Sequence, residues 1–364
     1  MNEVELETAK AGLEVNRKRN HGLDLLRILS ICGVVAIHVF GVRVGAAPKN
    51  GPSWWTATAI DIGFIWVVPV FIMISGALLL GSQRMLESPG KFYRKRAARI
   101  LPALIAWNLI YLVGVRIWLR HEELTGARIL QLLYDGSVFT QLYFLWIVVG
   151  LYAVAPVIGL FLSMGKPSWS LWTAGILLVT SILAYLLPTV LSHYGIMRPI
   201  NLNFLTLWIP YTGYFVAGYA LRNVRLKGLH LFWLVPAVAA MASFTIWHYG
   251  NRGVLPKVDV LINESYFGLF VAAVSLGVFV LALSITDGME IPQRCASAVR
   301  AMSEASFGVF LVHYVIFEVI RLNFTGVSTQ HSLRALAVAY VVTLAGSFAV
   351  SVIALRIPGI KRIF

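Results

Sequence analysis

The chain has 364 residues, of which 59% are hydrophobic and 13% are charged. Its mean hydropathy of +0.78 excludes an ordinary soluble globular protein, because such proteins contain fewer apolar residues. The net charge of +14 would suit a nucleic-acid-binding protein, but the cations gather in loops between apolar runs, which is typical of membrane proteins.

Apolar runs of about 20 residues recur along the chain, and each is long enough to cross a bilayer as a helix. We expect ten spans, at residues 23–46, 58–82, 100–120, 141–164, 170–191, 204–221, 230–248, 265–285, 306–323 and 332–355. The predicted fold class is therefore all-α, a polytopic membrane protein with about ten transmembrane helices. Between spans, the stretch 121–140 has apolar residues at helical spacing, which predicts a short helix along the membrane surface.

The segments outside the spans are short, which predicts one transmembrane domain over residues 23–355. Residues 1–22 are expected to form a polar N-terminal tail, and residues 356–364 a basic C-terminal tail. An even number of spans places both tails on one side of the membrane. The loops and tails on that side hold 19 cations outside the spans and the opposite loops hold 6, so the positive-inside rule predicts cytoplasmic termini. This distribution accounts for the basic charge without a nucleic-acid partner.

The first span carries three ionisable side chains, Asp24, Arg27 and His38. Arg27 and His38 are separated by about three helical turns, so both leave one face of a helix, roughly 16 Å apart along its axis. Asp24 lies near the same face and can pair with Arg27. Ionisable groups in a membrane segment usually face a bundle interior or a watery cavity, which makes them functional candidates. The alternative is a structural role, with an arginine reaching the interface and a histidine buried in the core.

The densest charged run is KFYRKRAARILP, residues 91–102. Its cations recur at helical spacing, so a helical loop would present a positive ridge leading into the third span, with Pro102 in the first turn of that span. Arginine makes planar two-point contacts with phosphate. The candidate phosphate ligands are Arg94, Lys95, Arg96 and Arg99. Attraction of the same charges to anionic lipid is the alternative.

Four segments together resemble the acyltransferase-3 family of integral membrane O-acyltransferases. The first has Arg27, ten residues and then His38, which is similar to the family's Arg-x10-His signature. The others are PVFIMISGALLL at 69–80, KRAARILP with its Arg-x-x-Arg spacing, and SEASFGVFLVHYVIF at 303–317. They run from the first span to the ninth, so the resemblance covers nearly the whole chain. The family often has an aromatic pair before the Ser-Gly step, whereas this chain has only Phe71 there.

The resemblance implies a membrane O-acyltransferase that moves an acyl group, usually acetyl, from cytoplasmic acyl-CoA to a hydroxyl of a surface or lipid-linked glycan. It implies acetyl-CoA as donor, a glycan or lipid-linked sugar as acceptor, and a multi-pass location in the plasma (bacterial inner) membrane. The cationic ridge would bind the phosphates of CoA. No metal is expected, since the sequence has no ligand pattern such as HExxH or paired CxxC.

The first span would supply the chemistry. An alcohol needs a base to take its proton, and a buried neutral imidazole suits that role. His38 is therefore expected as the general base or as a transient acyl carrier. Arg27 would lie about three turns away at the cytoplasmic mouth, where Asp24 would orient it. Ser75 is a candidate donor to the oxyanion of the tetrahedral intermediate, although a helical serine beside Gly76 also suits helix packing.

An acceptor vestibule is expected in the outer half of the membrane. Its candidate residues are Asp61, Arg116, Trp146, His313 and Glu318. His313 is expected to support the site more than to react. Pairing of Asp61 with Arg116, and an ordinary place for Trp146 in the interfacial aromatic belt, are the alternatives.

Two other functions are compatible with the same residues. A transporter or flippase for an anionic or sugar-lipid solute would place Arg27 and His38 in its translocation path. The chain shows no convincing internal repeat, which counts against this function. A non-catalytic membrane partner in glycan export is the third possibility.

Overall fold

The computed structural model of the protein describes residues 21–364, apart from the side chain of Lys257. Most of the expected N-terminal tail therefore lies outside the described residues. The described chain forms helices and turns without a strand, which confirms the all-α fold class. The surface helix expected within 121–140 is also present, as α7 (Gly126–Tyr134), and the Thr125 side chain caps it by accepting a hydrogen bond from the Arg128 N–H at 3.2 Å.

Eight segments of the described chain are helical, long and apolar enough to cross a membrane. They are α2 (His21–Gly45), α3 with α4 (Pro52–Gly63 and Val67–Leu79), α6 with the π-helix η1 (Pro89–Leu109 and Ile110–Leu119), α8 (Tyr143–Met164), α9 (Pro167–His193), α11 (Gly228–Gly250), α14 (Gln293–Asn323) and α16 (Leu333–Ala354). The other two expected spans form shorter apolar helices, α10 (Thr212–Leu221) and α13 (Leu269–Ile285). The short elements are α5 (Gln83–Glu87), η2 (Ile209–Tyr211), α12 (Pro256–Asp259), α15 (Thr325–Ser328) and η3 (Ile360–Arg362).

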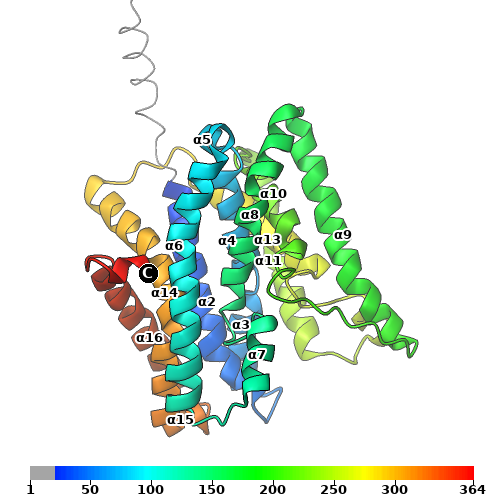
Figure 1. The fold of residues 1–364 in the computed structure, drawn as a ribbon. Coiled ribbons are helices and arrows are strands. Elements are labelled where there is room, and N and C mark those ends of the chain that lie inside the picture. The colour runs from blue at the N-terminus through cyan, green and yellow to red at the C-terminus, as the bar shows by residue number, and fades with distance from the viewer. Residues whose placement is uncertain (1–20) are drawn as a thin grey trace, which may run out of the picture.

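Helix α2 lies at the centre of the bundle, where it packs against α3, α4, α13, α14 and α16. Figure 1 shows α6 and α8 in front of this core, with α9 and α16 at opposite edges. The first turns of α2 and α6 lie at the same end as α5. We call this end the basic end, because Arg84, Lys91, Arg94 and Lys95 lie there. The first span is thus surrounded by other helices, as its ionisable residues require.

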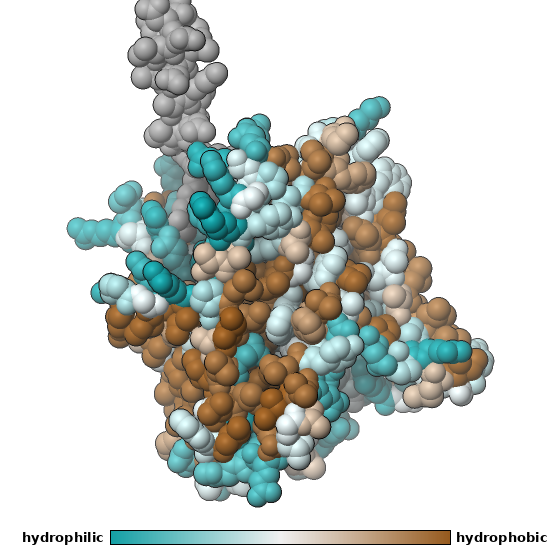
Figure 2. All heavy atoms as spheres, in the orientation of Figure 1, coloured by the Kyte–Doolittle hydropathy of each residue, from teal (hydrophilic) through white to brown (hydrophobic). Residues whose placement is uncertain are grey.

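A broad apolar band separates two polar ends of the molecule (Figure 2). Much of this band comes from helices at the edges of the bundle, such as α9, where Trp172 is 72% exposed and Ile176 is 62% exposed. An apolar surface this extensive is stable only when lipid covers it. The surface therefore supports a membrane protein.

Two helices begin more than ten residues earlier than the sequence predicted, at 89 in place of 100 and at 293 in place of 306. Helix α6 begins at Pro89, whose fixed φ suits a first helical turn, so the cationic run lies inside the helix. The prediction that Pro102 occupies the first turn is therefore wrong, because Pro102 lies in the helix interior. Helix α14 begins at Gln293, before the predicted span 306–323. Both helices begin with polar turns that precede their apolar parts. Hydropathy detects only the apolar parts, so the predicted starts came too late.

The Ser-Gly step of α4 is a close helix contact. A Cβ atom on Gly76 would lie 1.8 Å from the carbonyl oxygen of Phe215 in α10. The reciprocal contact is as tight, since a Cβ on Gly218 would lie 1.9 Å from the carbonyl oxygen of Met73. The two backbones can approach this closely only because both positions are glycine. This contact fixes the position of α4, which carries Phe71 and Ser75.

Candidate active site

A cavity of about 310 Å³ lies between α2, α4, α6, α8 and α14. Four residues predicted from the sequence line it together: Arg27, Ser75, Arg96 and Arg99. We call it the basic cavity. The rest of its lining is mainly aliphatic and aromatic and includes one acidic residue, Glu304, whose carboxylate pairs with Arg300 at 2.9 Å. The cavity therefore combines fixed positive charge with a largely apolar interior.

The two arginines from α6 lie against aromatic rings. The Arg96 guanidinium is 5.2 Å from the ring centroid of Tyr152 and 5.5 Å from that of Phe92. Arg99 lies 6.0 Å from the ring of Phe307. Such contacts hold a guanidinium in place without neutralising its charge. Neither arginine forms an ion pair with an acidic residue of the described chain, so both charges are available to an anion.

The other two candidate phosphate ligands point elsewhere. Arg94 and Lys95 are exposed and do not line the basic cavity. Helical spacing alone could not separate them from Arg96 and Arg99, because the cavity depends on the rings of α8 and α14.

Arg27 is held at the basic cavity by a contact between the first and last family-like segments. The Ser303 hydroxyl donates to Asp24 Oδ1 at 2.7 Å, and Arg27 Nη1 donates to Ser303 Oγ at 3.1 Å. Arg27 Nη1 also lies 3.9 Å from Asp24 Oδ1. Asp24 and Ser303 are both buried. The predicted pairing of Asp24 with Arg27 is therefore present, and Ser303, which the sequence did not single out, bridges it.

A second, smaller cavity of about 80 Å³ contains His38. We call it the histidine cavity. Polar residues at the start of α8 and before α13 complete its lining: Thr140, Gln141, Tyr143 and Tyr266. His38 lies eleven residues further along α2 than Arg27, which places the two residues in different cavities on one face of the helix.

Three phenylalanines line both cavities: Phe71 from α4, Phe144 from α8 and Phe310 from α14. The ring centroids of Phe71 and Phe144 are 6.1 Å apart, and those of Phe144 and Phe310 are 5.2 Å apart. We call these rings the phenylalanine wall. It stands between the arginines of the basic cavity and the imidazole of His38.

His313 lies behind His38. The two imidazole centroids are 5.3 Å apart with an interplanar angle of 25°. His313 Nδ1 lies 3.0 Å from the carbonyl oxygen of Val309, which can only accept, so a neutral ring carries its proton on Nδ1. Its Nε2 is buried and has no hydrogen-bond partner in residues 21–364.

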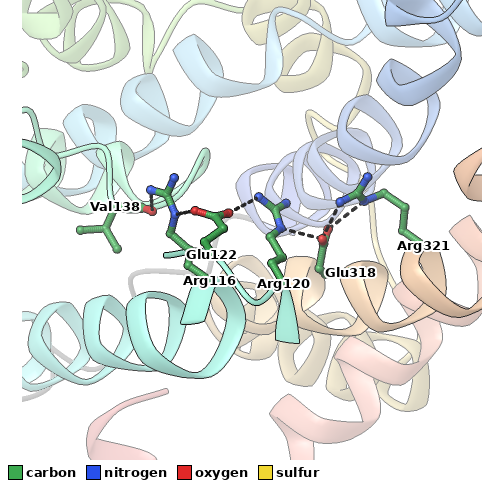
Figure 3. Close-up of polar contacts among 6 residues, drawn as sticks. All are labelled: Arg116, Arg120, Glu122, Val138, Glu318 and Arg321. Atoms are coloured by element: carbon green, nitrogen blue, oxygen red, sulfur yellow. Dashed lines mark hydrogen bonds and ion pairs between the residues drawn. The ribbon is translucent and has the colours of Figure 1, made fainter. Parts of the chain in front are cut away.

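Two predicted acceptor residues belong to a network of charges (Figure 3). The network lies where η1 ends, and Figure 1 shows this helix end opposite the basic end. Glu318 is fully buried and lies 2.7 Å from Arg120 Nε and 2.6 Å from Arg321 Nη2. Arg116 Nε donates to Glu122 at 2.7 Å, so the alternative pairing of Arg116 with Asp61 is absent. The network joins the end of η1 to α14, and none of these residues lines either cavity.

Asp61 and Trp146, two further predicted acceptor residues, have different neighbours. The Asp61 carboxylate faces Gly41 of α2, where a Cβ atom would lie 3.6 Å from Asp61 Oδ1. Gly41 is about one turn beyond His38, so Asp61 lies on the far side of the imidazole from the basic end. Trp146 packs against Phe204, with ring centroids 5.0 Å apart, and does not line the histidine cavity.

Gln141 is a functional candidate that the sequence did not suggest. Its side chain is 2% exposed, and neither its amide oxygen nor its amide nitrogen has a hydrogen-bond partner in the described chain. The nearby Tyr111 hydroxyl donates to the Leu311 carbonyl oxygen at 2.7 Å. A buried amide without a partner costs free energy. One glutamine at the start of an apolar run gives no pattern, so only its place in the histidine cavity reveals it.

Comparison with known proteins gives consistent matches along the chain. The sequence profile of the acyltransferase domain family matches residues 20–356. Nodulation protein 10 of Rhizobium leguminosarum bv. viciae is 25% identical over 331 residues, which are 82% of this chain and 83% of that protein. Acyltransferase MdmB of Streptomyces mycarofaciens is 26% identical over 323 residues, which are 80% of this chain and 77% of that protein. No solved structure matches.

Proposed function

Because the chain belongs to the acyltransferase-3 family and is a membrane acyltransferase, we propose that it transfers an acetyl group from acetyl-CoA to a hydroxyl of a surface or lipid-linked glycan. One observation carries this proposal: the basic cavity, with Arg27, Arg96 and Arg99, meets the histidine cavity at a shared wall. Family membership favours this enzyme over a transporter or flippase.

The basic cavity suits the donor. CoA carries several phosphates, and Arg96 and Arg99 present two guanidinium groups to the basic cavity that form no ion pair with an acidic residue of the described chain. The apolar lining beyond them suits the uncharged arm that ends in the thioester. The positive-inside rule orients the basic end toward the cytoplasm, where acyl-CoA is available. We therefore propose a multi-pass protein of the plasma (bacterial inner) membrane with cytoplasmic termini, whose single transmembrane domain covers residues 23–355.

His38 is proposed as the general base. Its imidazole would take the proton of the acceptor hydroxyl while the hydroxyl oxygen forms a bond to the thioester carbonyl carbon. Collapse of the tetrahedral intermediate breaks the carbon–sulfur bond, and the proton passes to the departing thiolate of CoA. A two-step variant, in which His38 carries the acyl group first, uses the same residue.

Gln141 is better placed than Ser75 to stabilise the oxyanion. The Ser75 hydroxyl donates to the Phe71 carbonyl oxygen at 3.1 Å and lines the basic cavity. Gln141 lines the histidine cavity, and its amide makes no hydrogen bond of normal geometry to the described residues, although the Tyr111 side chain lies close to it. An unpaired amide N–H in a site with little water is a strong donor to a developing negative charge.

The acceptor would reach His38 from the side opposite the basic cavity. Tyr143 and Tyr266 line the histidine cavity, and Asp61 lies about one helical turn beyond His38. Aromatic rings with polar tips, together with a carboxylate, are suited to a sugar. The charge network of Arg116 and Glu318 would support the outer end of this path without touching the sugar.

Transfer from labelled acetyl-CoA tests the proposal. Membrane vesicles that contain the full chain would be incubated with deuterated acetyl-CoA, and their glycans analysed for deuterated acetyl groups by mass spectrometry. We expect incorporation with the natural chain and none with His38→Ala, while His193→Ala, at the exposed end of α9, should retain it. Normal incorporation by a folded His38→Ala variant would refute the role of His38.

A further inference from the structure

We infer that Phe71, Phe144 and Phe310 select the donor by the length of its acyl group, admitting acetyl to His38 and excluding longer chains. This inference rests on the proposed function, because it concerns the passage of an acyl group from the basic cavity to the histidine cavity. It adds a specificity role for three residues that no catalytic step requires.

The three rings form the boundary between the basic cavity and the histidine cavity. Each of the three side chains lines both cavities, and each comes from a different helix. A thioester held by Arg96 and Arg99 must therefore extend its acyl group past these rings to reach His38. Among residues 21–364, no other side chain lines both cavities.

The space beyond the phenylalanine wall is much smaller than the basic cavity. The histidine cavity measures about 80 Å³, whereas the basic cavity measures about 310 Å³. Since a water molecule needs about 10–15 Å³ of such space, the smaller cavity has room for about five to eight waters. An acetyl group, together with the acceptor hydroxyl and the carbon that carries it, would fill most of this room, and an octanoyl chain would exceed it. A longer chain would have to displace Val34 or Val68, which are both buried, or push one of the rings aside.

The three rings pack against one another and against the histidine pair. Phe144 contacts both of its partners, at 6.1 Å from Phe71 and 5.2 Å from Phe310, so it cannot turn without moving a neighbour. Phe310 is buried and its ring lies 6.3 Å from that of His313. The wall is therefore connected to the histidine pair, and a displaced ring would disturb the site itself.

Single Phe→Ala substitutions at the three positions test this inference. Purified full-length protein in lipid nanodiscs would be given acetyl-, butyryl- and octanoyl-CoA together with a glycan extract of the producing cell as acceptor, and release of the CoA thiol would be measured for each. We expect the natural protein to prefer acetyl-CoA. In the variants the ratio of kcat/KM for octanoyl-CoA to that for acetyl-CoA should rise by about tenfold or more, because a methylene excluded from a pocket is worth roughly 10–200-fold.

Phe40→Ala is the matched control. Phe40 is a buried phenylalanine of α2 that packs against Tyr340, with ring centroids 6.0 Å apart, and lines neither cavity. It should lower stability without changing the preference for acetyl. Where an alanine variant does not fold, the corresponding Phe→Leu variant retains most of the volume, and a smaller shift of the ratio toward butyryl-CoA is expected.

The outcomes separate the inference from the proposed function. A natural protein that releases CoA from acetyl-CoA, together with three folded variants of unchanged chain-length preference, would overturn the selection role alone. Equal use of acetyl- and octanoyl-CoA by the natural protein would overturn it too. Absence of turnover with every acyl-CoA would instead overturn the proposed function.

Discussion

The imidazole of His313 stacks on the imidazole of His38 at 5.3 Å, although one lies on the ninth expected span and the other on the first. The contact brings the last family-like segment behind the first. Ser303 makes a second contact of the same kind, since it joins Arg27 to Asp24 from α14. Helix α14 therefore positions both ionisable groups that α2 presents to the two cavities.

If His313 only supports His38, any flat aromatic ring at position 313 should be sufficient for activity. His313→Phe retains a flat ring against His38, so most of the kcat should remain. His313→Ala removes the support and should lower kcat by about 10- to 100-fold, as expected when a reacting group is misplaced. Transfer of deuterated acetyl groups measures both effects. If His313→Phe were as inactive as His38→Phe, His313 would have to take part in proton transfer.

The arginines of the basic run are predicted to act unequally. Arg96→Ala and Arg99→Ala should each raise KM for acetyl-CoA by about tenfold, because a charge-assisted hydrogen bond is worth roughly 1.5–3 kcal/mol. Arg94→Ala is the control on the same helix, since its side chain is exposed outside the basic cavity. Its KM should change by less than about twofold. Equal effects at all three positions would favour general attraction to anionic surfaces.

Replacement of Gln141 by leucine, which has a similar size, should lower kcat with little change in KM for acetyl-CoA. The expected loss is about 100-fold, the usual cost of removing one oxyanion donor. Because both amide atoms of Gln141 lack partners among the described residues, the melting temperature should stay the same or rise. Gln131→Leu, at an exposed position of α7, is the control. A Gln141→Leu variant with full kcat would exclude the proposed donor role.

Gly76→Ala is predicted to destabilise the protein strongly. The added methyl would overlap the Phe215 carbonyl oxygen at 1.8 Å, and backbone cannot move aside as a flexible side chain can. The loss should be at least about 2 kcal/mol. Gly175→Ala is the control, because nothing lies within 4 Å of a Cβ at that helical position. Thermal unfolding in one detergent compares the two, and equal melting temperatures would contradict the close packing of α4 and α10.

Glu318→Gln should also destabilise the protein while leaving KM for acetyl-CoA unchanged. The substitution removes the buried negative charge between Arg120 and Arg321, and breaking a buried ion pair costs roughly 3–5 kcal/mol. Asp287→Asn is the control at a partly exposed pair with Arg225, for which a loss of about 0–1 kcal/mol is expected. A large rise in KM with unchanged stability would instead connect Glu318 to donor binding.

The sequence predicted what depends on one helix and missed what depends on several. Helical geometry placed Arg27 and His38 on one face of α2, and the structure has both side chains lining cavities on that face. It could not divide Arg94 from Arg96, because Phe92 and Tyr152 decide which cation lies beside the cavity.

Contacts between residues that lie far apart in the chain leave no pattern in the sequence. Glu318 pairs with Arg120 from a distant helix end, so the expected acceptor residue is part of a structural network. Gln141 has no motif of its own, and its neighbours in the histidine cavity come from α2, α4 and α14. Span length was also predicted imperfectly, because α10 and α13 are apolar but short.

The phenylalanine wall has a consequence for the membrane itself. A path that connects an enzyme's donor and acceptor sides is also a potential leak for ions and protons. Narrow constrictions lined by apolar rings exclude water and thereby block such leaks. Variants with smaller side chains at Phe71, Phe144 and Phe310, made to widen the donor range, would thus risk dissipating the electrochemical gradient of the cell that produces them.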